Sequence, residues 1–164
     1  MKRLLILLAL LAPLWAQAQI EVKKVGDTVT ILAKTQNLVS ELFEVVAIPV
    51  DTASIYALYV QTNNRYDDRM QIWLGFSQQE AITSLERIND LFDEKIGTTF
   101  ELPLTTGTAT AKVKKNGTAV FPTKKNKVGL YLSSSGYAGG QVLTRAIIES
   151  LIKQTKEYGE DAND

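Results

Sequence analysis

The chain has 164 residues, with 18 basic and 18 acidic side chains and neither histidine nor cysteine. Their absence excludes Ser-His and Cys-His nucleophile pairs, imidazole and thiolate metal sites, and the usual near-neutral general base. A carboxylate-dependent hydrolase or a calcium site stays open, whereas zinc is disfavoured. The balanced charge gives no global reason to expect nucleic acid as a partner.

The N-terminus has the three-part layout of a secretory signal peptide. Two basic residues are followed by an apolar run over residues 4–11 and then by Ala16-Gln17-Ala18, a small-x-small pattern that predicts cleavage after Ala18. Pro13 interrupts the run well before the about 20 apolar residues that a spanning helix needs. We therefore expect a periplasmic or extracellular protein with no transmembrane segment in the mature chain, which carries 16 basic and 18 acidic residues.

The first half of the mature chain has the pattern of several strands and one helix. Alternating apolar residues, Ile20 and Val22 and then Val29 and Ile31, predict two strands joined by a turn at Gly26-Asp27. Denser apolar runs predict buried strands at 42–50 and 55–60 and a further strand at 70–76.

Ser77-Gln78-Gln79-Glu80 is a capping box, in which the Ser77 hydroxyl accepts from the Glu80 amide and the Glu80 side chain reaches back to Ser77. The helix that follows repeats apolar residues at steps of four, three and four, which predicts one buried face. That face carries Ala81, Leu85, Ile88 and Phe92.

The second half has shorter strand patterns before its helix. Alternation over 109–114 predicts a strand, and Asn116-Gly117 predicts a tight hairpin into another at 118–121. Residues 128–132 predict the last strand. A final helix is expected from about Gln141 to Tyr158, with Leu143, Ile147 and Leu151 on its buried face. Residues 159–164 are expected to be a frayed acidic tail.

These elements predict an α+β fold with a largely antiparallel β-sheet and two amphipathic helices on one face. We expect residues 19–158 to form a single domain. The halves are loosely similar, because Ile72-Trp73-Leu74 and Leu130-Tyr131-Leu132 each precede a hydroxyl-bearing loop and a helix. The likeness is one of pattern and not of residue identity, so duplication and chance alternation both stay open.

A glycine-rich segment, LSSSGYAGGQV, joins the last predicted strand to the final predicted helix. Its spacing matches neither the P-loop nor the dinucleotide-binding fingerprint. Its backbone amides can still meet an anion at a helix N-terminus, although glycines of positive φ also make simple connections. The candidate ligand-binding residues are Ser134, Ser135, Gly136, Tyr137, Gly139 and Gly140.

Six lysines around the predicted hairpin are candidates for binding an anionic surface. They are Lys112, Lys114, Lys115, Lys124, Lys125 and Lys127. Such a basic surface suits an acidic glycan or a lipopolysaccharide head group. The alternative is that these lysines lie on edge strands and prevent edge-to-edge pairing. Only Phe121 lies nearby, which is too few aromatic residues for a single-stranded nucleic-acid surface.

These features predict a small exported, non-catalytic binding or interaction module with no cofactor and no metal, whose partner is a protein or a glycan. One alternative is a carboxylate-dependent glycan hydrolase using Asp67 or Asp68, which requires a pocket with two carboxylates about 5 to 10 Å apart. The other alternative is an inhibitor or chaperone-like partner protein, which requires an exposed apolar patch.

Overall fold

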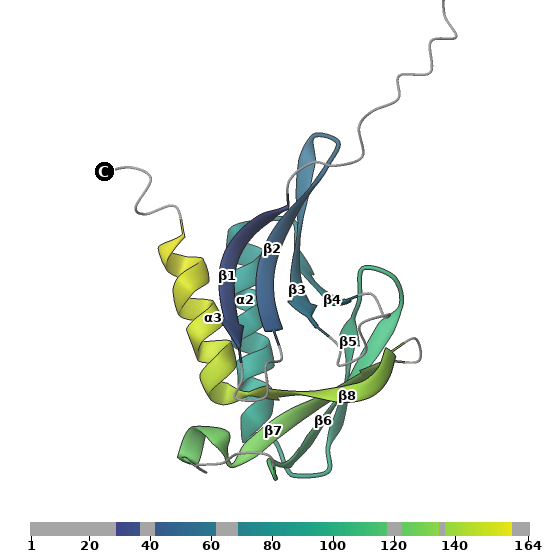
Figure 1. Ribbon diagram of the computed structural model, residues 1–164, viewed down its shortest axis with the longest axis vertical. Coiled ribbons are helices and arrows are strands. Elements are labelled where there is room, and N and C mark those ends of the chain that lie inside the picture. Colours follow the sequence, from purple (N-terminus) through teal and green to yellow (C-terminus); the bar gives the residue numbers. More distant parts are fainter. Residues whose placement is uncertain (1–28, 37–41, 62–68, 118–122, 135–136, 159–164) are drawn as a thin grey trace, which may run out of the picture.

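The computed structural model describes residues 29–36, 42–61, 69–117, 123–134 and 137–158. These residues form two four-stranded antiparallel sheets with two helices (Figure 1). The first sheet contains β1 (Thr30–Gln36), β2 (Leu42–Val50), β3 (Ala53–Val60) and β4 (Met70–Gly75). The second contains β5 (Thr99–Pro103), β6 (Thr108–Lys115), β7 (Val128–Ser134) and β8 (Tyr137–Thr144). The helices are α2 (Gln78–Asp90) and α3 (Arg145–Glu157), with short 3-10 helices η2 (Leu91–Asp93) and η3 (Lys124–Asn126).

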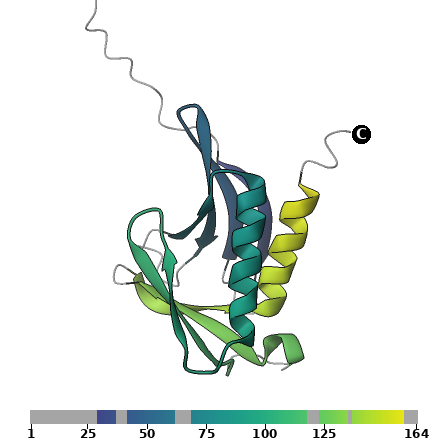
Figure 2. The same ribbon diagram turned by 180° about the vertical axis from the view of Figure 1, so that it is seen from behind.

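Both helices pack against the same face of the first sheet (Figures 1 and 2). Helix α2 contacts β3 and β4, while α3 contacts α2, β1 and β2. The second sheet lies at one end of this layer and faces the core with its apolar side. The predicted α+β class and the placement of both helices on one face are therefore confirmed, and the strands divide between two sheets.

One hydrophobic cluster joins both sheets and both helices. Leu58 and Ile72 come from the first sheet, Leu132 from the second, and Leu85 and Ile148 from the helices, each at most 1% exposed. The residues predicted for the two helical faces are all buried: Ala81, Leu85, Ile88, Phe92, Leu143, Ile147 and Leu151. Leu143, however, lies on β8 and Phe92 in η2, so their burial is confirmed but their place on an α-helix is not.

Strand β1 shows one error of the alternation pattern. Val29 and Ile31 are 36% and 46% exposed, while Leu32 and Ala33 are buried. The pairing with β2 shifts register between Ile31 and Ala33, and such an irregularity changes which side chains face inward. The strand predicted at 20–23 lies outside the described residues.

The final helix begins later than predicted, because Gln141 belongs to β8 and the first residue of α3 is Arg145. The Thr144 hydroxyl caps α3 by accepting a hydrogen bond from the Ile147 amide at 3.4 Å. The segment that was predicted to connect a strand to the final helix therefore includes the end of β7 and most of β8. Glycines are depleted in strands, so residue propensity does not predict β8, which contains a glycine pair.

The second sheet contains a strand that the sequence pattern did not predict. Strand β6 pairs with β7, with Lys115 opposite Val128. Its other neighbour is β5, a five-residue edge strand that ends in Pro103 and lacks a clear alternation. The strand predicted at 118–121 lies outside the described residues.

Each half of the fold is a four-stranded meander followed by a helix of 13 residues. The strands that precede the helices are β4 and β8. Leu130-Tyr131-Leu132 lies on β7, so it is not the counterpart of Ile72-Trp73-Leu74 on β4. The two halves therefore correspond in topology, but not through the aromatic strands that suggested the repeat.

Candidate functional site

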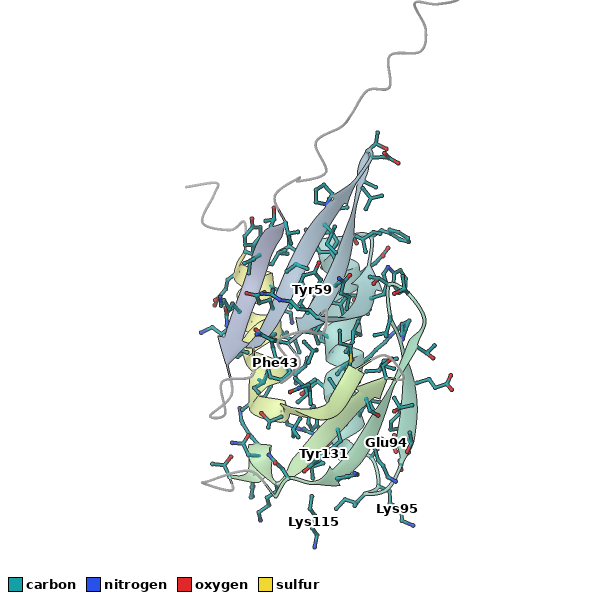
Figure 3. All side chains as sticks on the ribbon, turned by 45° about the vertical axis from the view of Figure 1, so that its right-hand side comes forward. Phe43, Tyr59, Glu94, Lys95, Lys115 and Tyr131 are labelled. Atoms are coloured by element: carbon teal, nitrogen blue, oxygen red, sulfur yellow. The ribbon has the colours of Figure 1, made fainter. Side chains whose placement is uncertain are left out.

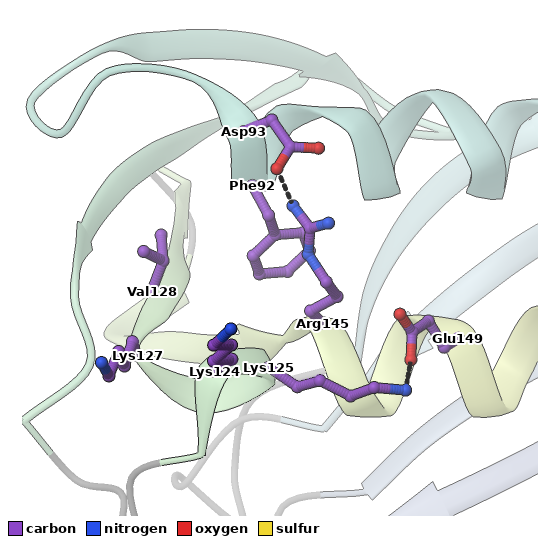
Figure 4. A pocket seen from close by; sticks show the side chains of 8 residues that line it. All are labelled: Phe92, Asp93, Lys124, Lys125, Lys127, Val128, Arg145 and Glu149. Atoms are coloured by element: carbon purple, nitrogen blue, oxygen red, sulfur yellow. Dashed lines mark hydrogen bonds and ion pairs between the residues drawn. The ribbon is translucent and has the colours of Figure 1, made fainter.

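A pocket of 490 Å³ lies where η2, η3, the start of β7 and the start of α3 meet (Figure 4). We call it the basic pocket. Eight residues line it: Phe92, Asp93, Lys124, Lys125, Lys127, Val128, Arg145 and Glu149. Its volume falls in the range of about 300 to 1,000 Å³ that is usual for small-molecule sites.

Local structure places these side chains around the pocket. The Thr144 cap starts α3 at Arg145, so Arg145 projects from the first helical turn and Glu149 lies one turn further on. Phe92 lies in η2 and is 5% exposed, so its side chain packs into the core at this end of the pocket. Helix η3 supplies Lys124 and Lys125 just before the chain enters β7.

Two of the four cationic side chains bind carboxylates of the pocket. Arg145 Nη2 donates to Asp93 Oδ1 at 2.6 Å, and its guanidinium lies over the Phe92 ring, 5.6 Å from the centroid. Lys125 Nζ donates to Glu149 Oε2. These two pairs hold Arg145 and Lys125 in defined positions at the pocket (Figure 4).

The side chains of Lys124 and Lys127 form no ion pair or hydrogen bond with any residue that the structure describes. The lining therefore has four cationic and two anionic side chains, a formal charge of +2. The N-terminus of α3 adds positive potential, because its first amides point out of the helix. This arrangement is suited to holding an anion.

The six lysines predicted as one basic surface separate into two groups. Lys124, Lys125 and Lys127 line the basic pocket. Lys112 and Lys114 lie on the exposed face of β6, and Lys115 ends that strand. At Lys112, β6 pairs with a neighbour on each side, so the edge-protection interpretation is wrong for this lysine. The pairing with β5 ends there, and Lys114 and Lys115 pair in register with β7 alone.

Among the described residues, the exposed face of the second sheet has a cation-aromatic contact. Lys114 Nζ lies 4.8 Å from the centre of the Tyr131 ring. The Tyr131 hydroxyl donates to the Lys115 carbonyl at 3.4 Å, and Figure 3 labels both residues. The Lys114 side chain therefore has a local contact within the sheet.

The glycine-rich candidate site is not at a helix N-terminus. Ser134 pairs with Tyr137 across the β7–β8 hairpin, and its hydroxyl donates to the Thr108 carbonyl at 3.2 Å. Gly139 and Gly140 lie within β8. Ser135 and Gly136 are outside the described residues, as are Asp67 and Asp68. The helix N-terminus that could meet an anion is therefore that of α3 at Arg145, and not the glycine-rich segment.

A second charged cluster lies on the face of the first sheet opposite the helices. Glu44 is buried on β2, and its carboxylate binds Lys34 at 3.2 Å and also Arg69. Arg69 lies 5.8 Å from the centre of the Tyr59 ring, which faces forward in Figure 3. Burial raises the pKa of the Tyr59 phenol, Arg69 opposes that rise, and Glu44 adds to it.

Sequence reasoning missed Asp93, Arg145 and Glu149 as pocket residues. Asp93 and Arg145 are 52 positions apart, so no local spacing connects them. A usable signal is Thr144-Arg145, since a threonine cap followed by a basic residue marks a helix start that displays a cation.

Among the described residues, no group of three or more carboxylates, histidines or cysteines could hold a metal ion. In the same part of the chain, no helix has the length and apolarity needed to cross a bilayer. The chain matches no known protein family, and comparisons with curated proteins and with solved structures give no significant match.

Proposed function

We propose that this protein is a small exported, non-catalytic binding module that holds an anionic ligand in the basic pocket. The observation that carries the proposal is the concentration of four cationic side chains around one 490 Å³ pocket, in a chain whose total charge is balanced. Lys124 and Lys127 are the principal anion contacts, because neither has an ion-pair partner among the described residues. Arg145 and Lys125 exchange part of their carboxylate contacts for the ligand.

A pair of matched double variants tests the proposal. Titration with inorganic phosphate and with a sulfated disaccharide, followed by amide chemical shifts, should move signals of η3 and of the first turn of α3. The double substitution Lys124→Gln and Lys127→Gln should weaken binding about 100-fold or more, since each of the two charge-assisted hydrogen bonds contributes about 1.5 to 3 kcal/mol.

The control is Lys112→Gln with Lys114→Gln, which removes the same charge from the exposed face of β6. It should bind as the unmodified protein does. Equal weakening by both double variants would show a diffuse charge effect and would contradict a site in the pocket.

The hydrolase alternative has one favourable feature, because the pocket contains two carboxylates, Asp93 and Glu149. Both are bonded to cations, and the Asp93 side chain is 74% exposed. A glycosidase general acid instead has apolar surroundings that keep it protonated. Loss of glycan turnover in Asp93→Asn, Glu149→Gln or Asp68→Asn would establish the hydrolase, whereas the binding module predicts that no turnover exists to be lost.

The partner-protein alternative is favoured by exposed apolar side chains on the first sheet and around it. Phe76 is 61% exposed and meets Trp73 edge to face at 5.5 Å, and Ile31 is 46% exposed. Pull-down from the native envelope fraction tests it. A stoichiometric protein partner whose binding is lost in Phe76→Ser, but not in the lysine variants, would favour this alternative.

Export is tested by the mass of the protein purified from its native cells. We expect a chain that begins at Gln19, as the Ala16-Gln17-Ala18 pattern predicts. A full-length cytoplasmic protein would contradict export and leave the anion-binding part of the proposal standing.

A further inference from the structure

We infer that the basic pocket takes a phosphate monoester attached to an apolar or ring-shaped body, and not an extended polyanion. The inference rests on the proposed anion-binding function and specifies the chemical class of its ligand. Three properties of the lining carry it: the excess charge, the position of the carboxylates and the apolar contribution of Phe92 and Val128.

The excess charge matches one dianionic group. Asp93 and Glu149 each bind one cation of the pocket, which leaves a formal charge of +2 on Lys124 and Lys127. A phosphate monoester carries about −1.5 to −2 at neutral pH and offers three acceptor oxygens. A sulfate monoester or a single carboxylate carries one negative charge and leaves one lysine without a counter-charge.

The carboxylates oppose a ligand with further charges along its length. In Figure 4, Asp93 and Glu149 lie on different sides of Arg145, and both are separated from Lys127. The Asp93 side chain is 74% exposed, so a chain of phosphates leaving the pocket on that side approaches a like charge. Repulsive elements of this kind exclude the wrong ligand even where the first contact is favourable.

The remaining space suits an uncharged body next to the phosphate group. A phosphoryl group fills only a small part of a 490 Å³ pocket. Val128 packs against the hydrophobic core and supplies apolar surface to the lining, and Phe92 contributes only the 5% of its surface that is exposed. Both residues are held in place by the core. Contact with the body of the ligand adds affinity in proportion to the apolar area that is buried.

Four probes, titrated calorimetrically, separate the components. Phenyl phosphate should bind about tenfold more tightly than inorganic phosphate, because the ring buries apolar area. It should also bind about tenfold more tightly than phenyl sulfate, because the second charge is lost. Linear polyphosphate should bind no more tightly than phenyl phosphate.

Variants assign each effect to its residues. Lys124→Gln with Lys127→Gln should abolish the preference for phenyl phosphate over phenyl sulfate. Val128→Thr keeps the β-branched shape and should reduce only the advantage of phenyl phosphate over inorganic phosphate. Asp93→Asn should strengthen polyphosphate binding relative to phenyl phosphate.

The outcomes distinguish this inference from the function on which it rests. Tighter binding of polyphosphate, with a steep salt dependence that Lys124→Gln and Lys127→Gln reduce, would overturn the inference and leave an anion site in the pocket. Equal affinities for phenyl sulfate and phenyl phosphate would also overturn the inference and leave an anion site in the pocket. Failure of all four probes to bind would contradict the inference and the proposed function together.

Discussion

Glu44 is a charged residue that is almost completely buried, because its side chain is only 4% exposed. Burial of an isolated carboxylate is costly, but two cations and hydrogen bonding to Arg69 offset the cost here. Lys34 and Arg69 keep about half of their side-chain surface in water, at 53% and 44%. The cluster therefore places one buried anion below two partly hydrated cations on the outer face of the first sheet.

Tyr59, next to this cluster, gives a pH-dependent prediction. Its pKa is raised above the ordinary 10.0, mainly by burial, so the folded state retains the phenol proton after the unfolded chain has lost it. The stability that this provides is fully present below the unfolded pKa and is lost as pH rises toward the folded pKa. The free energy of unfolding should fall between about pH 9 and about pH 11, and Tyr59→Phe should reduce that fall.

Denaturant titrations at the two pH values measure this difference. Tyr158→Phe is the control, because the Tyr158 side chain is exposed at 43%. It should keep the fall seen for the unmodified protein. A Tyr59→Phe variant that loses stability as steeply as the unmodified protein would contradict the assignment.

The junction of β4 and α2 is the element whose local geometry depends most on single residues. Ser77 accepts from the Glu80 amide at 3.2 Å, as the capping box predicts. The Glu80 carboxylate accepts from the Phe76 amide at 2.8 Å, one residue earlier than expected. Gly75 has φ +145, and a Cβ there would lie 2.5 Å from Glu80 Cβ. The tight turn thus requires a glycine before the cap.

Alanine substitutions at Gly75 and Gly97 distinguish the cost of backbone strain from the cost of steric overlap. Gly97 also has positive φ, at +102, but a Cβ there would meet no atom within 4 Å. We expect Gly97→Ala to cost about 1 to 3 kcal/mol of unfolding free energy through strain alone. Gly75→Ala should cost about 1 to 3 kcal/mol more, because Glu80 must also move. Chemical denaturation measures both, and equal losses would show that the overlap at Gly75 relaxes without cost.

At the scale of the whole molecule, the two halves share one hydrophobic core. Helix α3 follows the second sheet in the chain but packs on β1 and β2 of the first. Gln154 on α3 also accepts a hydrogen bond from the Lys34 amide of β1 at 3.1 Å. Because the last helix packs on the first strand, the two halves of the fold cannot separate without exposing the core.

This interlocking predicts cooperative unfolding. Leu132→Ala, in the second sheet, should lower the free energy of unfolding by about 2 to 5 kcal/mol. Amide exchange of β2 and β3 in the first sheet should accelerate to the same extent, because both sheets open together. Lys112→Gln on the exposed face of β6 should change stability by no more than about 0.5 kcal/mol. Unchanged exchange in β2 and β3 for Leu132→Ala would contradict a shared core.

Local patterns were sufficient for part of the fold and of the candidate site. Periodicity and side-chain chemistry between near neighbours predict the strands at 42–50 and 70–76, the Ser77 cap and the buried helical faces. Strand β8 was missed because Gly139 and Gly140 carry no propensity signal, so its place depends on pairing with β7. For the same reason, the predicted start of α3 was four residues early.

Composition and local periodicity are enough to predict the α+β class, the apolar faces of the helices and, through the lack of histidine and cysteine, the range of chemistry open to the protein. These are properties of composition and of neighbours within a few residues. The tertiary structure alone decided that the strands form two sheets, that α3 crosses to the first sheet and that Asp93 meets Arg145. Periodicity specifies that a face is buried but not what covers it, so a pocket built from distant segments follows only from how those faces pack.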